Sequence, residues 1–332
     1  MDFLSADSLP WLHSAQQRMR AALAAQRLPH SLLLLSAPGL GAEQLANWIT
    51  ALALCDSRGS RPCGVCASCQ LLRSDSHPHS YTVRLEEDAH QIKIDQVRGL
   101  LESLSLKSYR GGYKVGVIEG AELLNANGAN AFLKTLEEPT PNTVLVLIAR
   151  PTHRLPATIA SRCLRLSLSP PPAEAAIAWL NAIPQQPKPP VPHSWGAALA
   201  LAGGAPLLAV ELDGAGAAGL DADMQESLRQ LAAGRVDVTL LAERWMQLGP
   251  GLRIAWLENW ITQRVYEWMG AGTSRQSAEP VRLPAALLKP KIRALFELLD
   301  AARELRRLAT TGMNQQLALE ALLLGGRAAL AT

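Results

Sequence analysis

The chain has 332 residues, of which 48% are hydrophobic and 18% are charged, and its formal net charge is +3 at pH 7. The hydrophobic fraction excludes a mainly disordered chain, and the length predicts two or three domains. The small net charge excludes a protein that coats nucleic acid. No apolar run reaches the roughly 18 residues of a membrane span, and no basic segment precedes an apolar stretch at the start, so we expect a soluble cytoplasmic protein.

The first apolar run predicts a buried strand that leads through a glycine-containing loop into an amphipathic helix. Residues 31–36 read SLLLLS, and the loop that follows contains Gly39 and Gly41. This layout is typical of a phosphate-binding loop, in which Lys and then Ser or Thr follow the last glycine. Here those two positions are Ala42 and Glu43. The sequence therefore predicts a loop of this shape without the side chains that hold phosphate and Mg²⁺.

Four of the five cysteines lie within fifteen residues, which favours a metal site over disulfides in a cytoplasmic chain. Their spacing resembles C-x-x-C zinc sites, and four thiolates leave no open coordination position, so we expect one structural zinc per chain. The alternative is four free thiols, but free cysteines are usually buried, whereas this stretch is rich in Gly, Ser and Pro. Nearby, His77 and His79 are expected to be loop residues. The predicted ligands are Cys55, Cys63, Cys66 and Cys69.

Up to about residue 168, helical segments alternate with runs of Val, Ile and Leu. Such continuous apolar strands are buried on both faces, as in a parallel α/β sheet. The strands are expected over 31–36, 80–85, 114–119, 143–149 and 163–168, with helices over 45–54, 94–106 and 123–138.

The remainder of the chain reads as helical. A proline run at 169–172 breaks the α/β pattern, and 183–194 is a Pro-rich spacer. Helices are expected at about 195–202 and 206–212, and 213–219 reads as a flexible Gly/Ala link. Most Trp residues recur at helical spacing, which indicates core packing rather than a ligand site. We therefore predict domains over 1–168, 169–212 and 213–332.

Several strings resemble the bacterial DNA polymerase III clamp loader, a branch of the AAA+ ATPases. They are 28-LPHSLLLLSAPGLG, 130-NAFLKTLEEPTPNTVLVLIA, 155-LPATIASRC and, near the C-terminus, 312-GMNQQLALEALLL. The resemblance implies an AAA+ (RecA-like) parallel sheet domain with an inserted zinc module at about 55–70. It also implies a small helical lid domain and a C-terminal helical collar domain that holds subunits in a ring.

The resemblance also shows what a working ATP site would need. The second motif should end in Asp for Mg²⁺ and Glu for the attacking water, but here it reads Glu119 and Gly120. The first sensor position falls near Ala149 and Arg150, and the stretch 203–210 lacks the Arg of the second sensor. Several independent losses argue against hydrolysis, so we expect no functional ATP site in this chain.

One functional element of the family is complete, the SRC motif that contains Arg162. In clamp loaders this Arg acts in trans on ATP bound to the neighbouring subunit, where it stabilises charge on the phosphoryl group. The resemblance therefore implies a non-hydrolysing structural subunit whose partners are the gamma/tau ATPase subunits and the delta subunit. The complex would load the sliding clamp onto primed DNA, as a component of the DNA polymerase III holoenzyme.

Other readings stay open from the sequence. The chain could be a gamma/tau-type ATPase, or a stand-alone zinc protein that binds nucleic acid without forming a ring. Two basic clusters could face DNA phosphates, although solvated surface charge is the commoner explanation. The clusters comprise Arg154, Arg162 and Arg165, and then Lys107, Arg110 and Lys114.

Overall fold

The chain is described here by a computed structural model that divides into two compact units. The N-terminal unit comprises Met1–Pro172 together with Ala205–Leu208, and the C-terminal unit comprises Ala173–Gly204 and Ala209–Thr332. The structure describes residues 3–86, 89, 91–106, 112–150, 155–183, 195–214, 217–247, 250–268, 285–308 and 314–330.

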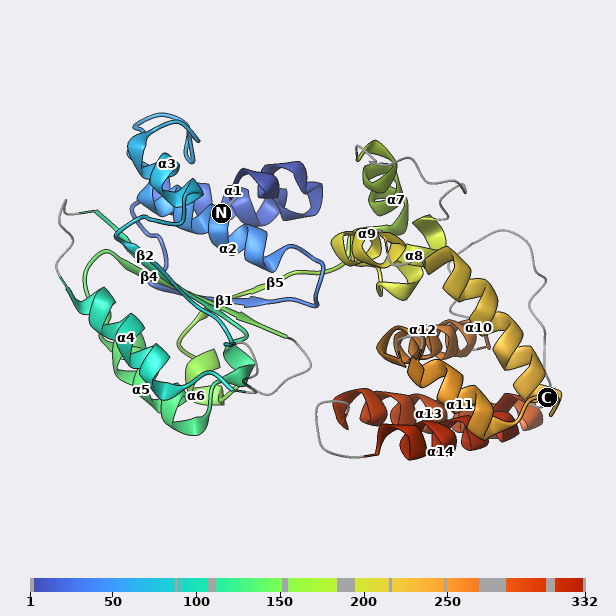
Figure 1. Ribbon diagram of the computed structural model, residues 1–332. Coiled ribbons are helices and arrows are strands. Elements are labelled where there is room, and N and C mark those ends of the chain that lie inside the picture. The colour runs from blue at the N-terminus through green and yellow to red at the C-terminus, as the bar shows by residue number, and fades with distance from the viewer. Residues whose placement is uncertain are drawn as a thin grey trace. The chain divides into compact units, whose positions relative to one another are not determined.

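Within the described residues of the N-terminal unit, five strands form one parallel sheet in the order β2-β3-β4-β1-β5 (Figure 1). The register pairs Ser31 with Leu145 and Leu32 with Leu164, so β1 lies between β4 and β5. All of β4 is buried, as expected for a sheet covered on both faces, and the predicted parallel α/β sheet is confirmed. The strands are β1 (Ser31–Leu35), β2 (Ser80–Val83), β3 (Lys114–Glu119), β4 (Thr143–Ala149) and β5 (Leu164–Ser167).

Helices cover both faces of this sheet. The helices α1 and α2 lie on one face and α4, α5 and α6 on the other (Figure 1). The side chain of Trp48 in α2 is fully buried on the first face, and Phe132 of α5 packs with Ile118 and Leu147 on the second. The helical elements are η1 (Phe3–Ser8), η2 (Pro10–Leu12), α1 (His13–Ala24), α2 (Ala42–Leu54), α3 (Ala67–Arg73), α4 (Ile94–Ser105), η3 (Ala121–Leu123), α5 (Ala126–Glu137) and α6 (Ala157–Ala160).

The residues directly before two of these helices explain where the helices begin. The helix expected from residue 123 begins at Ala126, because the Asn125 side chain accepts a hydrogen bond of 2.7 Å from the Gly128 amide. The helix α2 begins directly after Gly41, which has left-handed backbone angles. The sequence did not predict α1 or the short α3.

The described residues of the C-terminal unit are helical. Trp245, Trp256, Leu257 and Ile261 are buried, which confirms that these side chains form core. In Figure 1, α13 and α14 run side by side. The helices are α7 (Ala173–Ala182), α8 (Trp195–Leu201), α9 (Pro206–Gly214), α10 (Ala217–Ala232), α11 (Val238–Gln247), α12 (Pro250–Trp268), α13 (Ala285–Leu308) and α14 (Gln315–Leu330). The first residues of α9 belong to the N-terminal unit.

The expected flexible link at 213–219 is wrong in its bounds, because α9 continues to Gly214 and α10 begins at Ala217. Residues 215–216 lie outside the described residues. Alanine is the best helix former, and this stretch contains three Ala residues beside its three glycines. Residues 184–194 of the predicted Pro-rich spacer lie outside the described residues, and the boundary between a lid and a collar domain stays a prediction.

An ionic cluster joins three helices of the C-terminal unit. Asp223 of α10 accepts hydrogen bonds from Arg244 of α11 at 2.5 Å and from Arg253 of α12 at 2.8 Å. The Trp256 indole donates to Asp221 at 2.9 Å. Arg253 is buried, and the carboxylate of Asp223 compensates its charge where water cannot screen it.

No single helix of the described residues is both long and apolar enough to cross a membrane. The bent pair Trp195–Leu201 and Pro206–Leu212 meets that test only when its two helices are taken together, and only by length and composition.

Candidate functional site

The loop between β1 and α2 has the predicted shape of a phosphate-binding loop. Gly39 and Gly41 both have positive φ, at 76° and 88°, which glycine adopts without the strain that a Cβ causes. At the two positions that follow, Ala42 is buried with 2% of its surface exposed, and Glu43 is exposed in the first turn of α2. A buried methyl group therefore stands where a phosphate-binding Lys would be.

The loop is also covered by a distant part of the same unit. The Leu207 amide donates a hydrogen bond of 3.1 Å to the Gly39 carbonyl. A Cβ on Gly39 would lie only 2.4 Å from the Cβ of Leu208, so the two backbones are in close contact. Sequence reasoning missed this cover. The one available signal was that both leucines lie in 203–210, where the resemblance placed the second sensor.

The carboxylate that remains from the second motif is paired within the chain. Glu119 Oε2 lies 2.8 Å from Nε of Arg84, which follows the neighbouring strand β2. Burial raises the pKa of Glu119, whereas Arg84 opposes this shift and the charges of Glu43 and Asp75 add to it. The side chain is therefore an ion-pair partner at the end of β3. Sequence reasoning missed Arg84, although adjacent parallel strands bring their carboxyl ends together.

The other two predicted positions of the ATP site are a turn glycine and an arginine that pairs with a carboxylate. Gly120 has a φ of 81° and forms the turn after β3. Arg150, at the first sensor position, lies with its Nε 3.6 Å from Oε1 of Glu122, whose side chain is only 5% exposed. Arg150 therefore pairs with a buried carboxylate of its own unit.

Arg162 is held by both its backbone and its side chain. Its amide donates to Ile159 O at 3.0 Å, and its carbonyl accepts from Ser31 Oγ at 2.7 Å. Its guanidinium donates to Glu137 Oε1 through Nε at 2.9 Å and through Nη2 at 2.5 Å, and Nη1 donates to Thr158 O at 2.9 Å. About a third of the side chain stays exposed, at 35%. Sequence reasoning missed Glu137, although it lies in the LEEP string that carried the resemblance.

The four predicted cysteines come together at the end of α2. Their sulfur atoms all lie within 4.8 Å of one another, and the Cys55 and Cys66 sulfurs are 3.9 Å apart. Four sulfurs bound tetrahedrally to zinc at 2.3 Å are separated by about 3.8 Å. The donor set and its spacing therefore fit a tetrahedral metal ion.

Backbone amides of the same loop point at these sulfurs. The amides of Cys63, Cys66 and Cys69 each donate at 3.4 Å to the sulfur of Cys55, Cys63 and Cys66 respectively. Amide hydrogen bonds, first from Val65 and then from Cys66, lower the pKa of the Cys63 thiol to about 6. Burial raises the pKa of Cys55 and Cys69. A bound cation would offset this burial effect and keep all four as thiolates.

The two histidines lie beside this cluster without belonging to it. Nε2 of His77 is 2.7 Å from Ser68 Oγ, which also donates to the Leu54 carbonyl at 2.6 Å. Nδ1 of His77 accepts from the His79 amide at 3.1 Å. These contacts connect the loop after α3 to the end of α2.

Lys114 does not lie on a basic surface, so both sequence readings of its charge are wrong. It is 4% exposed, and its ammonium donates to the carbonyls of Leu104 and of Leu106, the latter at 2.7 Å. Burial lowers the pKa of this amine. The Arg165 Nε donates to the Ala160 carbonyl at 3.1 Å. Residues 107, 110 and 154 of the two basic clusters lie outside the described residues.

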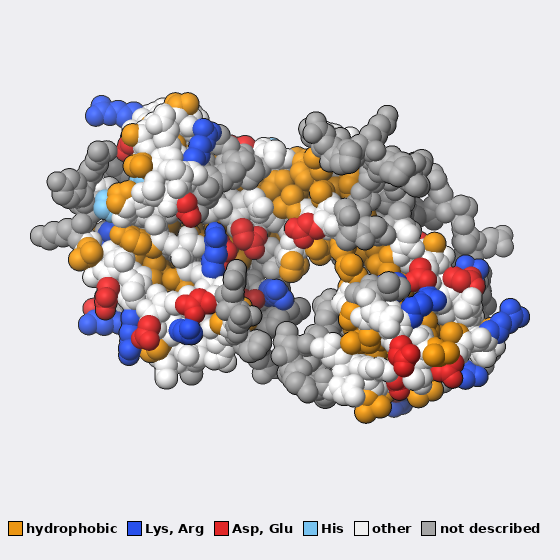
Figure 2. Space-filling model, viewed as in Figure 1, with side chains coloured by type: hydrophobic (Ala, Val, Ile, Leu, Met, Phe, Trp, Pro, Cys, Tyr) orange, Lys and Arg blue, Asp and Glu red, His pale blue; other side chains and the backbone are white. Residues whose placement is uncertain are grey.

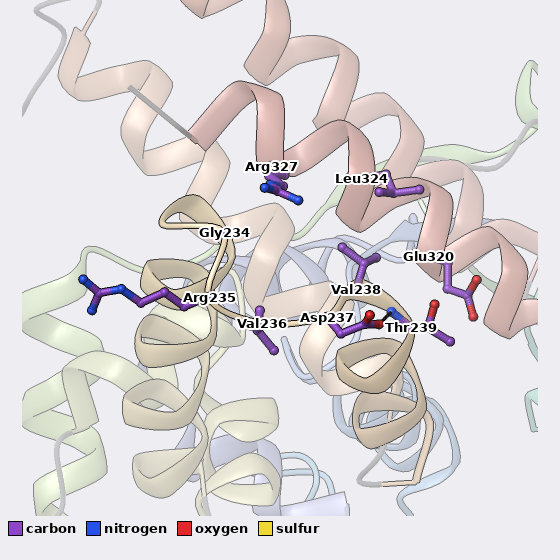
Figure 3. Close-up of a pocket in the computed structure, with 9 residues that line it drawn as sticks. All are labelled: Gly234, Arg235, Val236, Asp237, Val238, Thr239, Glu320, Leu324 and Arg327. Atoms are coloured by element: carbon purple, nitrogen blue, oxygen red, sulfur yellow. Dashed lines mark hydrogen bonds between the residues drawn. The ribbon is translucent and has the colours of Figure 1, made fainter.

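The C-terminal unit has a groove between α14 and the turn that joins α10 to α11. Its volume is about 500 Å³, and Figure 3 shows Leu324 and Arg327 of α14 facing this turn, whereas Arg235 points away. Leu317 and Leu324 of α14 and Leu240 of α11 are 65%, 57% and 65% exposed. Apolar side chains also lie among charged ones on the face of this unit seen in Figure 2.

Comparison with known proteins decides the family. A family model described as DNA polymerase III, delta subunit, matches residues 11–172. A Pseudomonas aeruginosa protein named DNA polymerase III subunit delta' is 33% identical over 326 residues, which cover 96% of this chain and 97% of that protein. The chain belongs to the DNA polymerase III delta' subunit family. The resemblance to the DNA polymerase III assembly predicted from the sequence strings is thereby confirmed.

Two further relatives show how far the similarity reaches. The delta' subunit of Yersinia pestis is 32% identical over 330 residues, which cover 97% of this chain and 96% of that protein. The Escherichia coli protein named DNA polymerase III subunit tau is 31% identical over 144 residues, which cover 43% of this chain and 22% of that protein. Similarity to these delta' subunits therefore spans both units, whereas the similarity to tau is partial.

Proposed function

We propose that this delta' family member is a non-hydrolysing structural subunit of the replicative clamp loader, located in the cytoplasm. It supplies Arg162 in trans to a neighbouring ATPase subunit, so that the sliding clamp is loaded onto primed DNA. Its partners are the gamma/tau ATPase subunits and the delta subunit. The chain acts on the sliding clamp and on primed DNA indirectly, through these partner subunits.

The contact between Leu207 and Gly39 is the observation that carries the non-hydrolysing role. A phosphate-binding loop works through backbone amides that point at the phosphates and through a Lys that neutralises them. Here Ala42 replaces the Lys, and the backbone of Leu207 and Leu208 lies against the loop. Loss of a charge-assisted contact weakens binding by roughly 1.5–3 kcal/mol, and the cover adds a steric barrier.

The position of Arg162 supports the role in trans. The residue stands at the end of α6 with a partly exposed guanidinium, on a backbone that two hydrogen bonds hold in place. The carbonyl and carboxylate groups that accept from this guanidinium belong to the same unit. A fixed guanidinium of this kind can stabilise charge on a transferring phosphoryl group.

The cysteine cluster is proposed to hold one structural zinc ion through Cys55, Cys63, Cys66 and Cys69. Four thiolates complete the coordination of the metal, so the ion would contribute folding energy and no chemistry. The ion would join the end of α2 to α3, because Cys55 directly follows α2 and Cys69 lies in α3. The helix that follows the degenerate loop would thus be stabilised without nucleotide.

The exposed apolar face of α14 is the part of the proposed collar that we assign to contacts with other subunits. Leu319, Leu322 and Leu323 pack inside the unit, whereas Leu317 and Leu324 are exposed one heptad apart. Exposed large apolar side chains that share a helix face often mark protein interfaces. These contacts require no nucleotide, which fits a subunit with a degenerate ATP site.

Two measurements test this function against its rivals. The purified chain should bind no fluorescent ATP at micromolar concentrations and should not turn ATP over, with a gamma-type subunit as positive control. Saturable binding with turnover would instead establish the gamma/tau-type ATPase, the second candidate, which the partial similarity to tau favours. Size-exclusion chromatography of the chain with gamma-type and delta subunits should give co-elution. Separate elution of the chain would contradict a role in the assembly.

A further inference from the structure

The guanidinium of Arg162 donates hydrogen bonds to Glu137 and, through Nη1, to the Thr158 carbonyl. A guanidinium carries one hydrogen on Nε and two on each terminal nitrogen. Glu137 Oε1 accepts from Nε and from Nη2, so this carboxylate binds the lateral edge of the guanidinium. The Thr158 carbonyl accepts from Nη1 at 2.9 Å. These three bonds orient the plane of the group.

The end of the fork keeps its hydrogen-bonding capacity. One hydrogen of Nη2 remains, and one of Nη1 meets only Ser161 Oγ, at 3.4 Å. The terminal pair Nη1 and Nη2 is the edge that binds two oxygens of a phosphate in parallel. A phosphate at this edge can therefore accept from the remaining Nη2 hydrogen, and from Nη1 in place of the long contact to Ser161.

We propose that Glu137 is a positioning residue for Arg162, and that it orients the terminal edge of the guanidinium toward a phosphate on a neighbouring subunit. This inference rests on the proposed role of Arg162 in trans. Glu137 touches neither nucleotide nor metal in this proposal. It acts by restricting the rotamers of a long side chain before the neighbour arrives, and such preorganisation lowers the entropic cost of placing the group.

The location of the pair fits positioning better than structural stabilisation. The side chains of Glu137 and Arg162 are 52% and 35% exposed, and an ion pair in contact with water adds little to folding stability. Glu137 is the last residue of α5. The C-terminal end of this helix does not depend on the Glu137 side chain, because the Glu138 amide donates to the Lys134 carbonyl. Removal of the carboxylate should therefore leave the fold intact and free the guanidinium to rotate.

The adjacent Glu138 offers a matched control. It is exposed like Glu137, and among the described residues its side chain has no hydrogen bond or ion pair. We compare Glu137→Ala, Glu137→Gln, Glu138→Ala, Arg162→Ala and the double variant Glu137→Ala/Arg162→Ala. Each is assembled into the full complex with gamma-type and delta subunits, and kcat and KM for ATP are measured with primed DNA.

Glu137→Ala should lower kcat roughly fivefold to tenfold with little change in KM, because a transition-state contact is misplaced. The kcat of Glu137→Gln should lie between those of Glu137→Ala and the native chain, since the Gln amide oxygen still accepts a hydrogen bond. Glu138→Ala should have the kcat and KM of the native chain. The double variant Glu137→Ala/Arg162→Ala should have a kcat no lower than that of Arg162→Ala.

Different outcomes separate the two claims. If Arg162→Ala is slow but Glu137→Ala is as fast as Glu138→Ala, the positioning role is wrong and the proposed function stands. A double variant several-fold slower than Arg162→Ala also overturns the positioning role, because Glu137 then acts on something else. If Arg162→Ala keeps native turnover in an assembled complex, the proposed function itself fails, and the positioning role with it.

Discussion

The loop after β1 and the Arg162 site lie in the same unit, but they preserve different parts of their motifs. At the loop, the backbone shape persists in Gly39 and Gly41, whereas the side chains for phosphate and Mg²⁺ are absent and Leu207 lies against the turn. At Arg162 the side chain of the motif persists, and it donates two hydrogen bonds to the Glu137 carboxylate. A motif's backbone therefore reports the fold, and only its side chains with their partners report the chemistry.

The largest expected effect concerns the cysteine cluster at the end of α2, because the loop at the start of this helix lacks the Lys that binds phosphate. Cys69→Ser should remove the metal, measured as a fall from about one zinc per chain to nearly none. The loss of folding free energy should be large, on the order of several kcal/mol, because binding energy at structural zinc sites is folding energy. Melting temperature and the rate of proteolysis between Cys55 and Arg73 report this loss.

Cys163→Ser is the matched control, because Cys163 is half-buried directly before β5 and does not belong to the four-cysteine cluster. It should keep the metal and nearly all the stability. A Cys69→Ser chain that retains zinc and melts like the Cys163→Ser chain would contradict the four-thiolate site.

The second effect tests whether the loop is closed by its own chain. Gly39→Ala should destabilise the N-terminal unit by about 2–3 kcal/mol, because the new Cβ would meet Leu208 and the φ of 76° strains any residue but glycine. Gly99→Ala, at an exposed position of α4 with no atom near its Cβ, should instead stabilise by about 0.5–1 kcal/mol. Urea unfolding of the two variants gives both values. Equal stability of the two would show that Leu208 does not press on the loop.

The sheet was predictable from sequence, because continuous Val, Ile and Leu runs have few other uses in a soluble domain. All five strands were located to within two residues at each end. The cysteine cluster was equally predictable, since its four members are neighbours in the chain. The short helix α3 was missed because its cysteines give no apolar period.

The contacts that decide the chemistry were much harder to predict. Lys114 reads as a surface charge, yet the carbonyls at the end of α4 accept its hydrogen bonds inside the unit. Arg84, Glu137 and Leu207 each act through a partner far away in sequence, and local patterns carry no information on such pairs. Motif reading therefore located the candidate sites, and the structure identified what each side chain contacts.

The third effect is smaller and concerns Glu119. Burial raises the pKa of this carboxyl above its ordinary value of 4.5, so the folded chain binds the proton more tightly than the unfolded chain does. Its contribution to stability is therefore complete below about pH 4.5 and is lost as the pH rises through the folded pKa. Glu119→Gln should lose less stability than the native chain as the pH rises from 4.5 to 7.

Urea unfolding at a series of pH values measures this difference, with the exposed Glu138→Gln as control. Added Mg²⁺ should shift neither curve, because Arg84 already pairs with the carboxylate. If Mg²⁺ stabilised the native chain through Glu119, the second motif would be a metal site. The ATP-site motifs would then keep a functional side chain, as the motif of Arg162 does.

The most direct test of the account is the ATP turnover of the reconstituted complex with Arg162→Ala in this chain. Arg165→Ala serves as the control, because its guanidinium donates to the Ala160 carbonyl at 3.1 Å, whereas that of Arg162 donates to Glu137. With primed DNA present, Arg162→Ala should assemble normally and lose turnover by about tenfold or more, as expected when an arginine supplied in trans is removed. Native turnover in the assembled Arg162→Ala complex would contradict the claim that this chain serves a neighbour's ATP.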